Sequence, residues 1–204
     1  MVAAGRRAEY AKATRESILA AARELFTTKG YFGTRVEDIA RAARVAPATV
    51  YAVGGGKNGL IRELIETAVR SEANVEIRAR IAAFTDPHEL IVFIVTTSAA
   101  KFEQWSGLMR QVVAAAPQEA AVRESLELAQ QSMRDGFART AQRLADLGAL
   151  RADLDVEQAT DVMWFFIGNA SYFTLTDDLA WPLPRSTEWL IRTLEPALLT
   201  APAQ

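Results

Sequence analysis

Cysteine is absent from this chain of 204 residues, and His88 is its one histidine. Disulfides, thiolate metal sites and cysteine redox switches are therefore excluded, and the residues for a zinc site are missing. The sequence also lacks a phosphate-binding glycine loop behind a strand and a nucleophile elbow. We therefore expect no enzyme activity, no cofactor and no metal ion.

Long hydrophobic runs are also missing. The longest uncharged stretch, 162–176, has 15 residues and contains Asn169 and Ser171. A membrane-spanning helix needs roughly 20 predominantly apolar residues, so we interpret this stretch as a buried helix. Arg6 and Arg7 near the start are followed by no apolar stretch, which argues against a secretory signal. We expect a cytoplasmic protein with no membrane partner.

Charge is unevenly distributed along the chain, although the net charge is only −2. Residues 1–60 hold ten Lys and Arg against five Asp and Glu, a net charge of +5. Residues 61–204 hold thirteen against twenty, a net charge of −7. A basic first quarter on an acidic body is the distribution expected of a chain whose beginning binds a polyanion.

Apolar residues recur with helical spacing in nearly every segment, and no segment longer than a few residues alternates as a strand does. In the first helix, Ile18, Ala22 and Leu25 share one face, and Gly30 stands where the helix would end. We predict an all-α fold of about nine helices. The later helices are expected near residues 57–80, 87–104, 106–116, 118–148, 156–176 and 185–199.

Two short helices are predicted between residues 34 and 56. Thr34 stands three residues before Glu37, which predicts a capping box at the start of the first of them. Pro47 suits the first position of the second, because its missing N–H needs no partner there. Gly54-Gly55-Gly56 then breaks the chain. This outline is typical of a helix-turn-helix.

The second short helix has the outer face that a DNA-reading helix needs. Small residues permit close approach in a major groove about 12 Å wide, and hydroxyl groups can bind bases or phosphates. Lys57, at the start of the following helix, could hold a phosphate together with free backbone N–H groups. The residues expected on this face are Pro47, Ala48, Thr49 and Tyr51.

Residues 14–64, TRESILAAARELFTTKGYFGTRVEDIARAARVAPATVYAVGGGKNGLIREL, resemble the N-terminal domain of TetR-family transcriptional regulators. The resemblance rests on spaced features in one register, and it covers about a quarter of the chain. Its elements are a first helix ending in Phe26, Lys29-Gly30-Tyr31, Gly33-Thr34, Ile39-Ala40, Ala43 with Val45, Thr49-Val50-Tyr51, and Gly56-Lys57 with Leu60.

The resemblance implies roles for individual residues. It implies that Thr34 anchors the first short helix at the DNA backbone, that the second short helix reads bases, and that Tyr51 and Lys57 contact phosphate. The sequence departs from the family at Val53-Gly54, where an aromatic residue and Phe are usual, and at Arg44 and Ala46, where Gly and Ser are usual. We include Arg44 as a further phosphate-contacting candidate.

The resemblance also implies a helical bundle that binds a small-molecule effector and forms a homodimer. Helical stripes of aromatic residues and Met are more often core than pocket, so the two interpretations stay open for each residue. The candidates for the pocket are Phe93, Thr97, Phe102, Trp105, Met109, Met133, Phe137, Trp164, Phe165 and Tyr172.

Residues 162–167 are apolar around the whole helix, and such a helix must be buried on every side. Near the end of a chain of this size, burial on every side suggests a subunit interface. A second apolar helix follows it, and together they could form a two-fold four-helix interface. The interface candidates are Phe166, Ile167, Trp189, Leu190, Leu194 and Leu198.

Three functions are compatible with these patterns. The first is a bacterial DNA-binding transcriptional regulator that binds double-stranded operator DNA as a homodimer, acting as a repressor released by an unidentified effector. The second is a helix-turn-helix-like interaction protein that no longer reads DNA, and the third is a small helical enzyme. For the first, we expect a DNA-binding domain over 1–56, a connecting helix over 57–80 and an effector-binding and dimerisation domain over 81–204.

Overall fold

The computed structural model describes residues 2–200, apart from the side chains of 2–5 and 7. Residues 1 and 201–204, at the limits of the predicted domains, lie outside the described part. Over 2–200 the chain forms α-helices and one short π-helical segment, with no strand. The predicted all-α class is confirmed.

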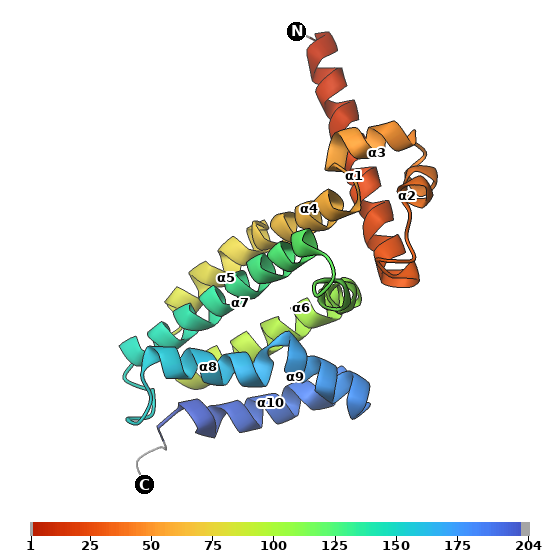
Figure 1. Cartoon of the computed structure of the whole chain (residues 1–204). Helices are drawn as coiled ribbons and strands as arrows, with labels where there is room; N and C mark the ends of the chain where they lie inside the picture. The colour runs from red at the N-terminus through yellow and green to blue at the C-terminus, as the bar shows by residue number, and fades with distance from the viewer. Residues whose placement is uncertain (1, 201–204) are drawn as a thin grey trace. The chain divides into compact units, whose positions relative to one another are not determined.

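Figure 1 shows the order of the helices along the chain. Short turns join most of them, and one isolated backbone bridge pairs Leu150 with Leu199. The elements are α1 Val2–Lys29, α2 Val36–Ala43, α3 Pro47–Gly54, α4 Lys57–Val69, α5 Glu72–Ala83, α6 Pro87–Ala115, α7 Ala120–Asp146, α8 Val156–Ile167, α9 Asn169–Phe173, the π-helical η1 Thr174–Asp178, and α10 Leu183–Leu198.

Two predicted helix boundaries near the middle of the chain are wrong. The helix predicted over 57–80 is divided into α4 and α5, because the chain leaves the helical path at Ser71, which has φ −59° and ψ 148°. Conversely, α6 continues through Ser106-Gly107, where a break was predicted. Gly107 lies close to α1, since a Cβ at this position would come within 2.6 Å of Thr27 Cγ2. The absence of a side chain at Gly107 permits close packing against α1, and the helix continues through this position.

The segment predicted as one helix over 156–176 is also divided. Asp155 and Gln158 form a reciprocal capping box that opens α8, with N–H···O distances of 2.8 and 2.9 Å. Gly168 ends α8 in an extended conformation, and α9 and η1 follow. The final helix, α10, begins at Leu183, two residues before the predicted start at 185.

The chain forms two compact units that do not follow the predicted domain limits. One unit contains the residues up to Arg70 together with Gly107–Ala129. The other contains Ser71–Ser106 and the residues from Gln130 onward. Both α6 and α7 therefore contribute residues to each unit. The functional division at 56/57 and 80/81 stays a prediction.

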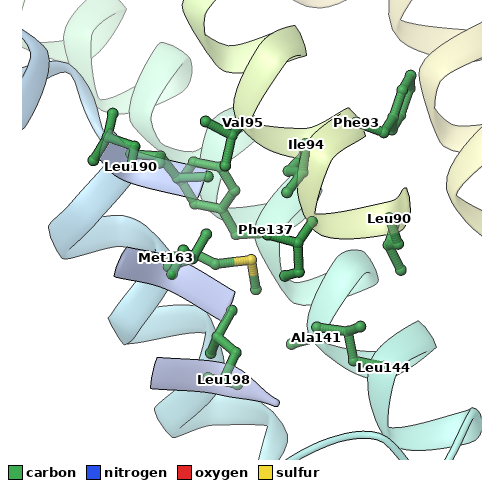
Figure 2. Packing of buried hydrophobic residues seen from close by; sticks show 14 of the residues in the cluster. Leu90, Phe93, Ile94, Val95, Phe137, Ala141, Leu144, Met163, Leu190 and Leu198 are labelled. Atoms are coloured by element: carbon green, nitrogen blue, oxygen red, sulfur yellow. The ribbon is translucent and has the colours of Figure 1, made fainter. Parts of the chain in front are cut away.

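The core of the second unit is built from aliphatic and aromatic side chains of α6, α7, α8 and α10. Figure 2 shows Met163 beside Phe137, with Leu190 and Leu198 contributed by α10. Leu90 and Val95 of α6 are fully buried in this cluster. On α7, α8 and α10 the inward positions recur every three or four residues, as amphipathic helices require.

Four residues predicted at the subunit interface belong to this core. Leu190, Leu194 and Leu198 are each 0% exposed and Ile167 is 1% exposed within the single chain. Side chains already buried within one protomer are not available to a second one, so their assignment to an interface is corrected. Phe166 and Trp189 are partly buried against the same core. These two remain interface candidates.

The end of α10 is fastened by a short antiparallel bridge. The Arg151 N–H donates to the Leu198 carbonyl at 2.9 Å, and the Thr200 N–H donates to the Ala149 carbonyl at 3.0 Å. The Arg151 guanidinium also donates to the Pro196 carbonyl at 3.4 Å. Carbonyl groups at a helix end normally lack partners. Here Arg151, in the segment between α7 and α8, supplies donors for two of these carbonyls.

Within residues 2–200, no helix combines the length and the hydrophobicity needed to cross a membrane. The described side chains likewise contain no group of three or more His, Cys, Asp or Glu placed to hold a metal ion.

Leu194→Ala tests the assignment of α10 to the core. Because Leu194 is fully buried, we expect the free energy of unfolding to fall by about 2–5 kcal/mol, measured by urea denaturation. Leu179→Ala is the matched control, since Leu179 is 53% exposed and its truncation should change stability by less than about 0.5 kcal/mol. Equal effects of the two variants would contradict the assignment.

Candidate nucleic-acid interface

Thr34 lies inside the protein and not on its surface. It is 1% exposed, and its hydroxyl donates to the carbonyls of Gly30 at 2.7 Å and Leu25 at 3.1 Å. The residue at the N-cap of α2 is Arg35, so the predicted capping box of Thr34 with Glu37 is wrong. The hydroxyl thereby links a carbonyl of the last turns of α1 to the carbonyl of the residue just beyond that helix. The assignment of this side chain to a DNA contact is therefore corrected.

Asp38 organises the first turn of α2. Its carboxylate accepts from the Arg35 N–H at 3.4 Å and from the Arg41 guanidinium at 3.2 Å, and Lys29 lies 3.8 Å away. The Arg35 N–H, followed by the charges of Lys29 and Arg41, holds the pKa of Asp38 below its ordinary value. Two nearby cations are thus partly neutralised within the protein.

The turn between α2 and α3 places a cation on the surface. Arg44 adopts the left-handed conformation, with φ 57° and ψ 43°, and the Val45 N–H bonds back to the Ala40 carbonyl at 2.9 Å. This is the geometry of a Schellman motif. The Arg44 side chain is exposed, and no described residue forms a salt bridge with it. Its position beside the start of α3 suits a phosphate contact.

The outer face of α3 carries most of the predicted reading residues. Pro47 occupies the first helical position as predicted, and Ala48 and Tyr51 are exposed. Thr49 is half-buried, while Val50 is the one side chain of α3 that is fully buried. The short helix thus presents a methyl group and a phenol to solvent and packs through the opposite side.

The three consecutive glycines fix a close crossing between α3 and α4. Gly56 has φ 95° and ψ −168°, a conformation that residues with a side chain rarely adopt. A Cβ added to Gly59 would lie 1.7 Å from the Gly54 carbonyl oxygen, and one added to Gly54 would lie 2.4 Å from Leu60 Cδ2. At Gly54, where the sequence departs from the family pattern, the packing against Leu60 leaves no room for a larger side chain.

Lys57 begins α4 as predicted, but its amine is directed into the protein. The Nζ atom donates to the Tyr31 carbonyl at 2.8 Å and lies 4.3 Å from the centre of the Tyr31 ring. Burial lowers the pKa of Lys57, and the charge of Glu119 opposes that shift. The amine is thus engaged within the protein in this structure, and the predicted phosphate contact stays a prediction.

The first part of α1 extends beyond the packed helices. Residues 8–13 are all exposed, and α1 first meets the α2–α3 turn near Ser17, whose hydroxyl donates to the Ala43 carbonyl at 3.4 Å. Figure 1 shows this end of α1 projecting past α3. Further along α1, Arg15 forms an ion pair with Glu63 of α4.

One exposed cation of this region escaped prediction. Arg35, at the N-cap of α2, is exposed and lies in the same short segment as Arg44. Its signal in the sequence is its position immediately before the first of the two short helices, next to Thr34. The inward contacts of Lys57, in contrast, have no signature in the sequence, because their partners are distant in the chain.

The ten predicted pocket residues separate into three groups by exposure. Phe93, Phe102, Met109, Phe137 and Tyr172 are buried, whereas Thr97, Trp105, Met133 and Trp164 are half-buried. Phe165 is 71% exposed, so its assignment to an internal pocket is wrong. It faces away from Met163 and Ile167, the inward side chains of α8. Met109 belongs to the first unit and the others to the second.

Tyr172 shows how closely the buried aromatic residues pack. Its ring stacks on Phe102 with the ring centres 4.9 Å apart, and its hydroxyl donates to the Val95 carbonyl at 3.2 Å. Burial raises the pKa of Tyr172, so the phenol stays protonated. Its polar group is satisfied by the protein itself, as a core residue requires.

A short α2, a tight turn and a short α3 with an exposed small-residue face define the chain as a helix-turn-helix protein. Residues 18–64 match the model of the bacterial regulatory proteins of the tetR family. A 94-residue region is 33% identical to the HTH-type transcriptional repressor NicS of Pseudomonas putida. That region covers 44% of this chain and 44% of the repressor.

Solved structures share the fold over nearly the whole chain. The fatty acid degradation regulator FadR of Bacillus halodurans matches 89% of this chain and 94% of its own, with a TM-score of 0.75 and 17% identity. SmeT of Stenotrophomonas maltophilia, in complex with triclosan, matches 93% of both chains, with a TM-score of 0.72 and 19% identity. Residues 18–64 are thus similar to the N-terminal segment of the tetR family, and the solved regulators share the fold of the chain.

Gly59→Ala tests the close crossing of α3 and α4. The added methyl group meets the Gly54 backbone, so we expect a loss of about 1–3 kcal/mol of stability, with a displaced α3, measured by thermal unfolding and amide exchange. Gly136→Ala in α7 is the control. Beyond the nearby backbone of its own helix, no atom comes within 4 Å of the added Cβ, so the change should be neutral or stabilising by up to about 1 kcal/mol. A neutral Gly59→Ala would contradict the crossing.

Proposed function

We propose that the protein is a transcriptional repressor that reads operator DNA with α3 in the major groove. The observation that carries this proposal is the outer face of α3, where Pro47, Ala48 and Tyr51 are exposed beside the unpaired cation Arg44. Small side chains allow the helix backbone to approach base edges, and a cation at the preceding turn can bind phosphate. Operator binding would place the protein in the cytoplasm.

Further cations near this face support binding to a polyanion. Arg35 is exposed at the N-cap of α2, and Arg6 and Lys12 are exposed on the projecting part of α1. A helix that extends beyond the core with no packing partner gains little from folding alone. We infer that this part of α1 adds phosphate contacts beside the groove occupied by α3. The net charge of +5 over residues 1–60 is consistent with this role.

We further propose a homodimer formed through the outer sides of α8 and α10, which pack against each other within the chain. Phe165 is 71% exposed, and its ring lies 5.2 Å from that of the half-buried Phe166. Trp189 on α10 is also half-buried. Exposed aromatic residues that adjoin one another are typical of interaction surfaces. A two-fold dimer presents two copies of α3 to half-sites about one helical turn of DNA apart.

A small-molecule effector completes the proposal. SmeT, which shares the fold, has triclosan bound in its structure. In this chain the half-buried Thr97, Trp105, Met133 and Trp164 are the predicted pocket residues that a ligand could reach with the smallest rearrangement. Effector binding is proposed to favour a conformation in which the two copies of α3 no longer fit both half-sites. Residues 1–56 would then bind DNA, 57–80 connect, and 81–204 respond and dimerise.

The repressor proposal is tested by selecting purified protein against a random pool of DNA duplexes. We expect an inverted repeat whose binding weakens steeply with salt. Recovery of no sequence at low salt, from a protein shown to be dimeric, would contradict DNA reading. It would favour the interaction-protein alternative.

Arg44→Gln tests the proposed phosphate contact on the selected duplex. Loss of one phosphate contact should weaken binding and make the dependence of log K on log salt less steep by about 0.9 per site. Arg139→Gln is the matched control, since it removes the same charge from an exposed position on α7. If both variants changed the salt dependence equally, the effect would come from net charge and not from a contact.

Phe165→Glu tests the proposed interface. A carboxylate in place of the exposed ring should be costly to bury, so we expect a shift from dimer to monomer in sedimentation equilibrium. The monomer should keep its helical content, because Phe165 contributes little to the core. Val92→Glu on α6, also at an exposed position, should leave the dimer intact. A dimeric Phe165→Glu variant would contradict this interface.

A further inference from the structure

Tyr31, in the turn between α1 and α2, has every polar group engaged by the protein. The residue is 3% exposed. Its N–H donates to Gln111 Oε1 at 3.4 Å, its carbonyl accepts from Lys57 Nζ at 2.8 Å, and its hydroxyl donates to Asn58 Oδ1. The ring lies 5.8 Å from that of Phe26 and beneath the Lys57 amine. Side chains thus engage both backbone groups and the phenol of this residue, and the carbonyl also accepts from the Thr34 N–H at 3.4 Å.

The partners of Tyr31 come from outside the helix-turn-helix. Lys57 and Asn58 are the first two residues of α4, and Gln111 belongs to the second half of α6. The residues concerned all lie in the first compact unit. The turn that leads into α2 and α3 is therefore bonded to two other helices. One is α4, which follows α3 directly, and the other is α6, whose Gln111 lies more than fifty residues beyond Asn58 in the chain.

The neighbourhood of Tyr31 leaves little freedom for other arrangements. A Cβ added to Gly30 would lie 3.0 Å from Gln111 Oε1, so the glutamine also approaches the preceding residue closely. Burial and the charge of Glu119 raise the pKa of Tyr31, which keeps the hydroxyl available as a donor. Removing Gln111 would leave the buried Tyr31 N–H without its acceptor, which is costly. Removing Lys57 would leave the Tyr31 carbonyl with only the longer bond from the Thr34 N–H.

We propose that Gln111 and Lys57 are positioning residues for DNA binding, which act through Tyr31 by fixing the orientation of the helix-turn-helix on α4 and α6. In this role Lys57 contributes to operator affinity without contacting a phosphate. Gln111 contributes as well, although it lies on α6. The inference rests on the proposed DNA-binding function and adds to it a defined link between α6 and the reading helix.

The salt dependence of operator binding separates positioning from phosphate contact. We expect Gln111→Leu and Lys57→Met each to weaken binding to the selected duplex about three- to tenfold, as the loss of one net hydrogen bond implies. The slope of log K against log salt should stay at the wild-type value in both variants, whereas a lost phosphate contact changes it by about 0.9. The double variant should lose less than the product of the single effects, because both residues hold Tyr31.

Two further variants guard against a general loss of folding. Gln111→Glu keeps a carbonyl-type acceptor for the Tyr31 N–H and should bind DNA close to wild type. Gln118→Leu, at an exposed glutamine just beyond α6, should leave affinity unchanged. Hydrogen exchange of the free protein provides the local readout. The Tyr31 amide should exchange faster in Gln111→Leu while amides in the core of the second unit keep their wild-type rates.

A Lys57→Met variant with a salt slope lowered by about 0.9 would show that Lys57 contacts phosphate and would overturn the inference. So would wild-type affinity and wild-type Tyr31 exchange in Gln111→Leu. Failure of the wild-type chain to bind any duplex would instead overturn the proposed function, and the inference with it.

Discussion

The orientation of α3 depends on what holds its two ends, because the helix itself is too short to hold its own position. It has eight residues, and of their side chains only that of Val50 is fully buried. An isolated helix of this length is unstable in water, so its stability must come from tertiary contacts. At one end the chain turns through the left-handed Arg44, and at the other it passes through Gly55 and Gly56 into α4. The sharpness of both connections determines which face of α3 remains open.

The same region decides which cations are available to a partner. Lys29 and Arg41 lie next to Asp38, Arg15 pairs with Glu63, and Lys57 is directed towards Tyr31. Only part of the excess positive charge of the first sixty residues is therefore available to bind a partner. The exposed cations that form no salt bridge among the described residues include Arg35 and Arg44, on either side of α2. A polyanion approaching α3 would meet these two.

Much of the fold could be predicted because helical spacing and capping residues are local signals. Pro47 at the start of α3, the end of α2 before Arg44 and the all-α class follow from such signals. The errors came from residues whose role is set by distant packing. Thr34 has the sequence position of an N-cap but bonds to the carbonyls of Leu25 and Gly30, and Gly107 has the signature of a break but allows contact with Thr27. Neither partner can be inferred from neighbours in the sequence.

The candidate sites divide in the same way. The exposure of Pro47, Ala48 and Tyr51 follows from the period of one short helix and was predictable. A stripe of apolar residues, by contrast, does not say whether it packs within one chain or between two. Leu194 and Phe165 illustrate this, because the predicted interface residue Leu194 is fully buried within the chain, whereas the predicted pocket residue Phe165 is exposed. Only the relative placement of α8 and α10 distinguishes them.

The bridge between Leu150 and Leu199 changes how the last helix can fray. Helix termini usually open first, because their outermost carbonyls have no partners. In α10 the carbonyl of Leu198 is paired with the Arg151 N–H, and the following residue, Thr200, is paired with Ala149. The amino end of the helix is held differently, by the Trp181 N–H bonded to the Leu175 carbonyl at 2.9 Å and by the Trp181 ring beside that of Trp189. The carboxyl end of α10 is therefore protected from the fraying that an unpaired helix end undergoes.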